Sequence, residues 1–565
     1  MFGRFLRAAL VPLGFATLLN AAPMLRLVNS AVVPVPMPAG ANGGTQIVEA
    51  YNAGDGSLSL AGNPTSSVPW ITTSYGPSRA CTSTTAATTC IPLQLVLNTS
   101  TLAASPIPYT GTVTVNGAAN VVDAPQTITV TVRIGALTVF VAPGSSSGVS
   151  FSTHSPLNAS PSTQDGNRWL SLVQDGSGSF KFTLPYKINV APPAGMAQGT
   201  YTGSLIASGS SFPPDNQTIP VTMRVTTQPI AQPFPDHVTE RLAQGAAPLA
   251  RQISLNNPGQ GSIVFGAVSA TTTDGGKWLT ASANSGGWAA ITLDPGTLAP
   301  GFYTGSVSIA SNAANGTVTV PVSFQVVAKG APTANYLGVV DNAIFGSGDA
   351  VAPGDIVDVF GEQFWFASNI AFSPGVPLAT QITASGSTSS VLVNGRAAPL
   401  YFSTYGQIAF QVPLETAVGT AQVQVQRDGL SGNTVSVQVV ARAPRILVIT
   451  KQDLSVPDSA HPARVGDYLT IWAIGLGPTN PAVGTNVPAP GSEPLARLTV
   501  TPAVEFGSTI FGTISATPSF AGLSPGSVGL YQINVAIPAG VVSGNVNVAL
   551  SFPDSASNTV QIAVQ

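Results

Sequence analysis

The feature that most constrains the fold is a phrase that returns three times along the chain. It reads PYTGTVTV at 108–115, GTYTGSLIASGS at 199–210 and GFYTGSVSIAS at 301–311. Its tyrosines are Tyr109, Tyr201 and Tyr303, which lie 92 and then 102 residues apart. A spacing of about 100 residues indicates a repeated domain of that size.

The same features flank each copy of the phrase. A tryptophan followed by an aliphatic residue precedes it, at Trp70, Trp169 and Trp278. An alternating segment follows it, at 126–134, 217–225 and 317–327. Alternation places Val and Ile on one face and Thr on the other, as in a half-buried strand. We therefore predict immunoglobulin-like sandwiches whose cores are filled by the repeat tryptophans and tyrosines, the alternative being an exposed ligand platform.

The composition supports an all-β chain. Only 8% of the 565 residues are charged, and 58 Gly and 48 Pro suit many short strands joined by tight turns. The length is too great for one hydrophobic core. A net charge of −3 offers no clustered basic face, so we expect no nucleic-acid partner.

The sequence motifs change after a short Gly/Pro/Ala linker. From Tyr336 onward, two passes share a GD pair entering an apolar strand, at Gly354 and Gly466, 112 residues apart. They also share a QI strand at Gln407 and Gln532, 125 residues apart. This pattern predicts an internal duplication of two small sandwiches.

Two family resemblances follow from these residues. The third unit, with QISLNNPGQGSIVFGAVSA, KWLTASANSGG and GFYTGSVSIAS, resembles the BACON-type immunoglobulin-like domain, whereas the second unit lacks a clear opening strand. That resemblance implies an extracellular setting and binding of carbohydrate or mucin. The segment from 336 resembles an uncharacterised C-terminal domain family of secreted acidobacterial proteins, with two halves of the IPT/TIG kind. It implies no known activity or ligand.

The expected fold class is all-β, built of tandem immunoglobulin-like β-sandwich domains. The expected layout is a signal peptide at 1–22, immunoglobulin-like domains at 23–134, 135–227 and 228–328, a linker at 329–335, and sandwich halves at 336–441 and 442–565.

The amino terminus predicts export. Arg4 and Arg7 precede an apolar run, and small residues near Ala22 suit cleavage. The alternative is a short membrane anchor, but the run is shorter than the about 20 residues that span a bilayer. We expect a secreted or surface-held mature chain without a membrane span.

The two cysteines predict a disulfide. Cys81 and Cys90 flank the small polar loop TSTTAATT. A zinc site would need further ligands, and His154, His237 and His461 are distant in sequence. The alternative is two reduced thiols.

The chain offers little chemistry, and we expect no enzyme activity, cofactor or metal. GSSSG at 144–148 matches G-x-S-x-G around Ser146, but β-forming residues follow it instead of a helix, which favours a flexible connection. Four aspartates lie close together in the sequence but lack the spacing of a calcium-binding loop, so we interpret them as turn-forming residues. They are Asp341, Asp349, Asp355 and Asp358.

One aromatic triplet departs from its surroundings. Phe364, Trp365 and Phe366 follow the strand-like DIVDVFG. Adjacent side chains of an extended segment point to opposite faces, so all three cannot enter one core. We predict that at least one lies at a loop surface and contacts a ligand, the alternative being local packing.

The sequence thus favours a secreted, non-catalytic binding or adhesion protein that contacts an extracellular carbohydrate or a cell-surface protein. A structural spacer or a component of a surface assembly is the alternative. A carbohydrate-active enzyme is a remote one.

Overall fold

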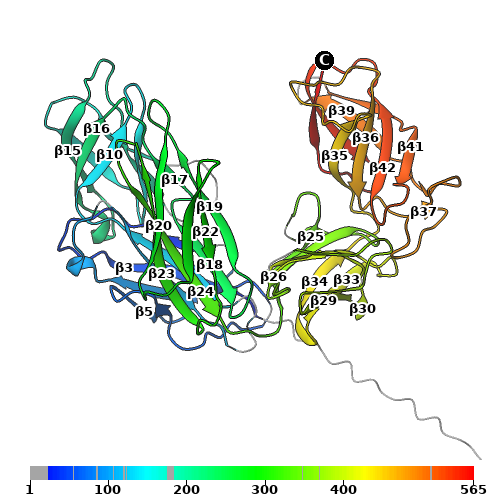
Figure 1. The fold of residues 1–565 in the computed structure, drawn as a ribbon, viewed down its shortest axis with the longest axis horizontal. Coiled ribbons are helices and arrows are strands. Elements are labelled where there is room, and N and C mark those ends of the chain that lie inside the picture. Colours follow the sequence, from blue (N-terminus) through cyan, green and yellow to red (C-terminus); the bar gives the residue numbers. More distant parts are fainter. Residues whose placement is uncertain are drawn as a thin grey trace, which may run out of the picture.

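The computed structural model confirms an all-β chain of tandem immunoglobulin-like sandwiches. It describes residues 23–54, 56–83, 87–105, 107–118, 121, 124–174, 184–346, 348–367, 370–508 and 512–565. The predicted signal peptide lies outside these residues. The described residues contain no helix long and apolar enough to cross a membrane. Figure 1 shows domains 1 to 3 in one lobe, blue to green, and the two C-terminal halves in a second lobe.

Domain 1 comprises strands β1 to β9 in two sheets. One sheet has the order β1 (Leu25–Leu27), β3 (Gly44–Asn52), β7 (Thr89–Leu97), β5 (Ile71–Tyr75), with β6 (Arg79–Ala80) also paired to β7. The other has the order β2 (Ala31–Val32), β9 (Gln126–Val132), β8 (Tyr109–Val115), β4 (Thr65–Ser66). The short 3₁₀ helix η1 (Thr99–Thr101) follows β7.

Domain 2 comprises strands β10 to β16. One sheet has the order β10 (Leu137–Val141), β16 (Thr218–Val225), β15 (Gly199–Ser208), β12 (Asn158–Thr163). The other has three strands, β11 (Ser147–Thr153), β14 (Leu184–Val190) and β13 (Leu170–Gln174). The 3₁₀ helix η2 (Pro213–Asp215) precedes β16.

Domain 3 comprises strands β17 to β24. One sheet has the order β17 (Gln232–Phe234), β19 (Leu249–Asn256), β22 (Trp288–Leu293), β21 (Leu279–Asn284). The other has the order β18 (Val238–Ala243), β24 (Val318–Val327), β23 (Gly301–Ser311), β20 (Phe265–Thr272). All three domains pair an early strand parallel to the last one: β2 with β9, β10 with β16, β18 with β24. Among the residues that the structure describes, domain 2 has no counterpart of the opening strands β1 and β17, which agrees with its missing opening motif.

The C-terminal segment forms two further sandwiches, half A and half B. One sheet of half A has the order β25 (Thr333–Asp341), β26 (Ile356–Glu362), β32 (Gln407–Gln411), β31 (Leu400–Ser403), β27 (Ala371–Phe372). Its other sheet has the order β28 (Gln381–Ala384), β29 (Ser387–Val393), β33 (Gly419–Arg427), β34 (Leu430–Val439), and β30 (Arg396–Ala397) also pairs with β29. One sheet of half B has the order β35 (Arg445–Lys451), β36 (Tyr468–Ile474), β42 (Tyr531–Ala536), β41 (Phe520–Leu523), β38 (Arg497–Leu498), β37 (Thr479–Asn480). Its other sheet has the order β40 (Gly512–Ala516), β39 (Ala503–Ser508), β43 (Gly544–Ser551), β44 (Val560–Val564).

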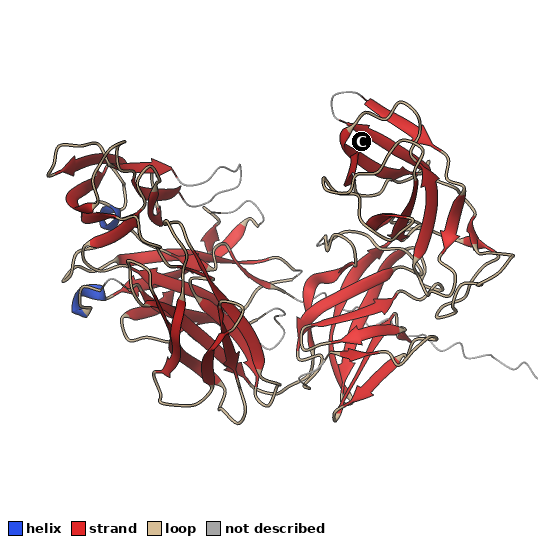
Figure 2. Ribbon diagram, turned by 45° about the horizontal axis from the view of Figure 1, so that its top comes forward, coloured by secondary structure: helices blue, strands red, loops and turns tan. Residues whose placement is uncertain are grey.

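The two halves share most of one architecture, which agrees with the predicted duplication. The orders β25-β26-β32-β31 and β29-β33-β34 of half A match β35-β36-β42-β41 and β39-β43-β44 of half B. The edge strands differ, because β28 precedes β29 in the chain whereas β40 follows β39. Each half also carries a lone parallel bridge, Val351 to Val439 in half A and Ala463 to Val564 in half B. The glycines of the two GD pairs have positive φ, 83° at Gly354 and 92° at Gly466, a backbone angle that glycine adopts without steric cost. Figure 2 shows that strands dominate both lobes.

The repeated YTG phrase has a physical explanation in domain 3. The hydroxyl of Tyr303 donates to the carbonyl of Ala299 at 2.8 Å, a tyrosine corner that fixes the turn before β23. A Cβ at Gly305 would lie 2.6 Å from the Thr271 carbonyl and 3.4 Å from the Trp278 ring, so only glycine allows this approach. The Trp278 indole nitrogen in turn donates to Asp274 at 3.1 Å.

Domain 2 repeats these contacts and domain 1 repeats most of them. The hydroxyls of Tyr201 and Tyr109 donate to Ala197 and Ala103. Trp169 donates to Asp165 at 3.0 Å. The tryptophans are 7%, 1% and 3% exposed in domains 1, 2 and 3, and the tyrosines are half-buried at the core edge. The predicted core role of the repeat tryptophans is therefore confirmed.

Candidate functional site

The aromatic triplet lies at the junction between domain 3 and half A. Phe364 and Trp365 are 0% and 1% exposed and belong to the core of half A. Both can enter that core because the chain is not extended here: Gln363 has a φ of 62°, which breaks the alternation that the sequence argument assumed. Neither of these two residues is therefore the surface ring predicted for at least one member of the triplet.

Phe366, unlike Phe364 and Trp365, packs against the core of domain 3. Its ring lies edge-on to Tyr405 at 6.0 Å, with the Arg427 guanidinium at 4.3 Å and the Lys329 ammonium at 4.7 Å from its centroid. The Arg427 side chain is buried and donates to the carbonyls of Gln363 and Gly330. Local packing, the alternative interpretation of the triplet, accounts for this ring.

A surface hollow of about 480 Å³ nevertheless borders Trp365. Its rim includes Phe372, which is 66% exposed, and Ile370, which is 53% exposed. The Trp365 indole nitrogen is buried and has no hydrogen-bond partner among the described residues. Polar groups of Gln381 and Thr383 also line the hollow. A buried donor without a partner is costly, but this nitrogen is closed off from solvent, so a ligand in the hollow reaches it only if the side chains around it move.

The predicted disulfide is confirmed, with the Cα atoms of Cys81 and Cys90 4.9 Å apart. Buried Glu49 holds the enclosed loop by accepting hydrogen bonds from the backbone nitrogens of Thr82 and Ser83, and it pairs with Arg79 at 2.6 Å. Burial acts to raise the pKa of Glu49, but these hydrogen bonds and the Arg79 charge outweigh it and lower the pKa below its usual value.

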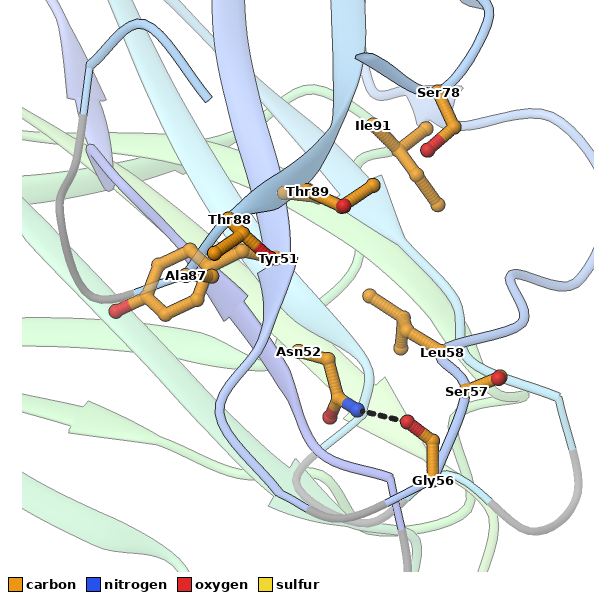
Figure 3. A pocket seen from close by; sticks show the side chains of 11 residues that line it. Tyr51, Asn52, Gly56, Ser57, Leu58, Ser78, Ala87, Thr88, Thr89 and Ile91 are labelled. Carbon is orange, nitrogen blue, oxygen red and sulfur yellow. Dashed lines mark hydrogen bonds between the residues drawn. The ribbon is translucent and has the colours of Figure 1, made fainter. Parts of the chain in front are cut away.

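A second hollow, of about 500 Å³, lies beside this loop (Figure 3). Tyr51, Leu58 and Ile91 contribute its apolar wall. The Asn52 side chain donates to the carbonyl of Gly56 at 2.9 Å across its lower edge. No charged side chain of the described residues lines this hollow, so it offers no electrostatic selectivity.

Ser146 occupies an exposed turn between β10 and β11, and strand β11 begins at the next residue. The interpretation of GSSSG as a connection is confirmed, because a nucleophile elbow requires a helix at this point.

Two of the four aspartates, Asp341 and Asp349, contact Arg445 across the junction between half A and half B. Asp341 accepts from the backbone nitrogens of Ala343 and Ile344, as a turn-forming aspartate does, and also lies 3.3 Å from Arg445 of half B. Arg445 pairs with Asp349 at 3.0 Å. Across the described ranges, no three acidic, His or Cys side chains are placed to hold a metal ion.

The buried carboxyl of Asp355 is the most perturbed of the four. It is 0% exposed, and burial raises its pKa to about 8, with the neighbouring Asp341 adding to the rise. Hydrogen bonds from the backbone nitrogens of Ala352 and Ile356 partly oppose the shift. Asp355 is thus a structural acid that is neutral over much of the physiological range. Buried Asp358 is held by the amides of Asn342 and Gln407.

The sequence pattern did not predict a cleft of about 770 Å³ that domains 1, 2 and 3 form jointly and that both polar and apolar side chains line. Domain 1 contributes the outer face of β8 and β9, domain 2 the start of β11, and domain 3 the segment from Gln232 to Thr239. Three charged or titratable side chains line it: Arg133, Asp236 and His237. The signal in the sequence was the alternation of Thr127, Thr129, Thr131 and Arg133 opposite the core residues of β9, but nothing there indicated what this face meets.

Comparisons with known proteins place the chain in no family. No protein-family model matches it, and no curated protein matches it. Solved structures with similar folds include the surface layer protein SbsC, domains 4–9, at 16% identity over 72% of this chain and 57% of that chain, with a TM-score of 0.18. Sidekick-1 immunoglobulin domains 1–5 match at 10% identity over 96% and 99% of the two chains, with a TM-score of 0.15.

An endo-fucoidan hydrolase of glycoside hydrolase family 107 matches at 11% identity over 55% of this chain, with a TM-score of 0.15. The chain spans 45% of the length of that structure. At such identities and TM-scores these likenesses carry no argument about function, so the function rests on the geometry of this chain alone.

Proposed function

We propose that the chain is an extracellular, non-catalytic binding protein whose tandem sandwiches recognise glycan. The Cys81–Cys90 disulfide supports an oxidising compartment, as does the predicted signal peptide. The described residues form five hydrophobic cores, which suit a protein that presents binding surfaces on a stable scaffold. The resemblance to BACON-type domains points in the same direction.

The observation that carries this proposal is the hollow beside Trp365. Sugar rings present apolar C–H faces that stack on flat aromatic side chains, and Phe372 offers such a surface at the rim. The ring of Phe372 is held beside Phe402 at 6.2 Å, which limits the entropy lost on binding. The indole N–H of Trp365 has no partner but is closed off from solvent, so it donates to a sugar hydroxyl only after the side chains at the rim move.

Glycan-array binding tests the proposal with three variants. Phe372→Ala removes the stacking ring, and Trp365→Phe removes the indole N–H while keeping an aromatic core residue. Phe345→Ala is the matched control, because Phe345 is an exposed phenylalanine of half A outside the hollow, 48% exposed. We expect the first two variants to lose binding about tenfold, equivalent to about 1.4 kcal/mol, and the control to bind as wild type. Undiminished binding by both variants would remove this site.

A structural spacer is the second candidate, and the junction of domain 3 with half A favours it. The backbone nitrogen of Ala243 donates to the Tyr405 hydroxyl at 2.7 Å, and Arg241 pairs with Glu362 across the junction. Such contacts hold the two lobes in a fixed arrangement, as a spacer requires. Absence of binding by the wild-type chain to any glycan would favour this alternative.

A further inference from the structure

The cleft shared by domains 1, 2 and 3 contains a cation without a bound counter-ion. Arg133 continues the outer row of β9, opposite the core residues Val130 and Val132, and lines the cleft. Its guanidinium makes no hydrogen bond or ion pair of 4 Å or less with any described residue. Burial lowers the pKa of Arg133, and the charge of Asp236 opposes this only in part. Arg133 is half-buried, and a partly buried guanidinium without a hydrogen-bonding partner is costly to keep.

The one carboxylate in the cleft is already engaged. Asp236 binds the Nδ1 nitrogen of His237 at 2.7 Å, and this hydrogen bond lowers the pKa of Asp236 and raises that of His237. Glu240, just beyond the cleft, is likewise paired with Arg251 at 2.6 Å. The five donors of Arg133 are therefore left for a ligand, in a fork that matches a carboxylate.

The rest of the cleft wall is rich in hydroxyl groups. Threonines of domains 1 and 3 line the cleft: Thr110, Thr127, Thr129, Thr131, Thr239 and Thr319. Hydroxyls both donate and accept, so they complement a polyhydroxylated ligand better than an apolar one. The volume of about 770 Å³ falls in the range of about 300–1,000 Å³ typical of small-ligand sites.

We infer that this cleft binds an acidic oligosaccharide, with a sugar carboxylate on Arg133 and sugar hydroxyls on the threonine wall. The inference rests on the proposed glycan-binding function but places a separate site in the other lobe. The Arg133 fork bonds the carboxylate in bidentate fashion and removes the cost of the unpaired charge. The threonines select a sugar chain over an acidic peptide, because a peptide offers few hydroxyls to satisfy them.

Calorimetric titration of the full chain with trigalacturonate tests this inference. Arg133→Gln should weaken binding about tenfold or more, since hydrogen bonds to charged groups are the strong ones. Arg133→Lys keeps the charge but loses the fork, so its affinity should fall between those of wild type and Arg133→Gln. Arg224→Gln is the control, because Arg224 is an exposed arginine of domain 2 that lies over Phe140 and outside the cleft. Thermal unfolding of each variant shows that the fold is retained.

Ligand variants separate the parts of the inference. The methyl-esterified trimer, which lacks the carboxylates, should bind at least about tenfold more weakly than trigalacturonate. A triglutamate peptide should also bind more weakly. Equal affinity for the ester, equal affinity for the peptide, or equal affinity of Arg133→Gln and wild type would each overturn the inference. If wild type binds no trigalacturonate but still binds neutral glycans through half A, this inference fails and the proposed function stands.

Discussion

Replacing Trp278 by alanine tests how the repeated phrase holds a domain together. Trp278 is 3% exposed, and its ring lies 5.4 Å from that of Phe324 and 6.1 Å from that of Tyr303, measured between centroids. Truncation removes these contacts and leaves a cavity against Gly305. Large aromatic-to-alanine changes in cores cost about 3–5 kcal/mol. The lost hydrogen bond to Asp274 adds little, because that exposed carboxylate is then solvated.

Calorimetric unfolding of the full chain measures this cost. For a domain of about 100 residues, 1 kcal/mol shifts the midpoint by about 4–8 °C, so the domain 3 transition should fall by at least about 12 °C. Trp288→Ala is the matched control, since Trp288 is a half-buried tryptophan of the same domain. It should shift the same transition by much less. Equal shifts for the two variants, or no shift for Trp278→Ala, would refute the packing argument.

Three further outcomes follow from the structure. Reduction of the Cys81–Cys90 bridge should lower the stability of domain 1 by about 2–3 kcal/mol, and two reactive thiols in the unreduced, denatured chain would contradict the bridge. Asp355 binds its proton more tightly when folded, so unfolding of the C-terminal lobe should become easier as pH rises from about 4 to 8, by at most about 1.4 kcal/mol per pH unit. Asp355→Asn should flatten this pH profile, and an unchanged slope would show that another group causes it. Phe366→Ala should open the junction beside Arg427 and speed protease cleavage in the 329–335 segment, whereas unchanged cleavage would mean that the other contacts suffice.

The fold could be predicted because its determinants are local and repeated. The tyrosine corner of Tyr303 spans four residues, and the Trp278 ring rests on the glycine two positions after that tyrosine. Such contacts leave the same phrase wherever the domain recurs. The GD pairs are similar, because a positive φ before each apolar strand requires glycine at Gly354 and Gly466.

The sites could not be predicted in this way because they depend on how domains meet. Phe364 and Trp365 both enter one core where the chain leaves the extended conformation at Gln363, whose left-handed backbone angle no residue type signals there. Arg133 and Asp236 face one cleft although they are far apart in sequence and belong to different domains. Alternation showed that Arg133 lies outside the core of domain 1, but only the packing of three domains shows what surrounds it.

The central claim, that the chain binds glycan without cleaving it, is tested most directly by one incubation of the full chain with a panel of neutral and uronic-acid polysaccharides. Both the protein retained on each polysaccharide and the reducing ends released are measured. We expect retention on at least one polysaccharide, strongest on those with free carboxylates, and no rise in reducing ends over time. Reducing ends that increase with protein concentration, or no retention on any polysaccharide, would contradict it.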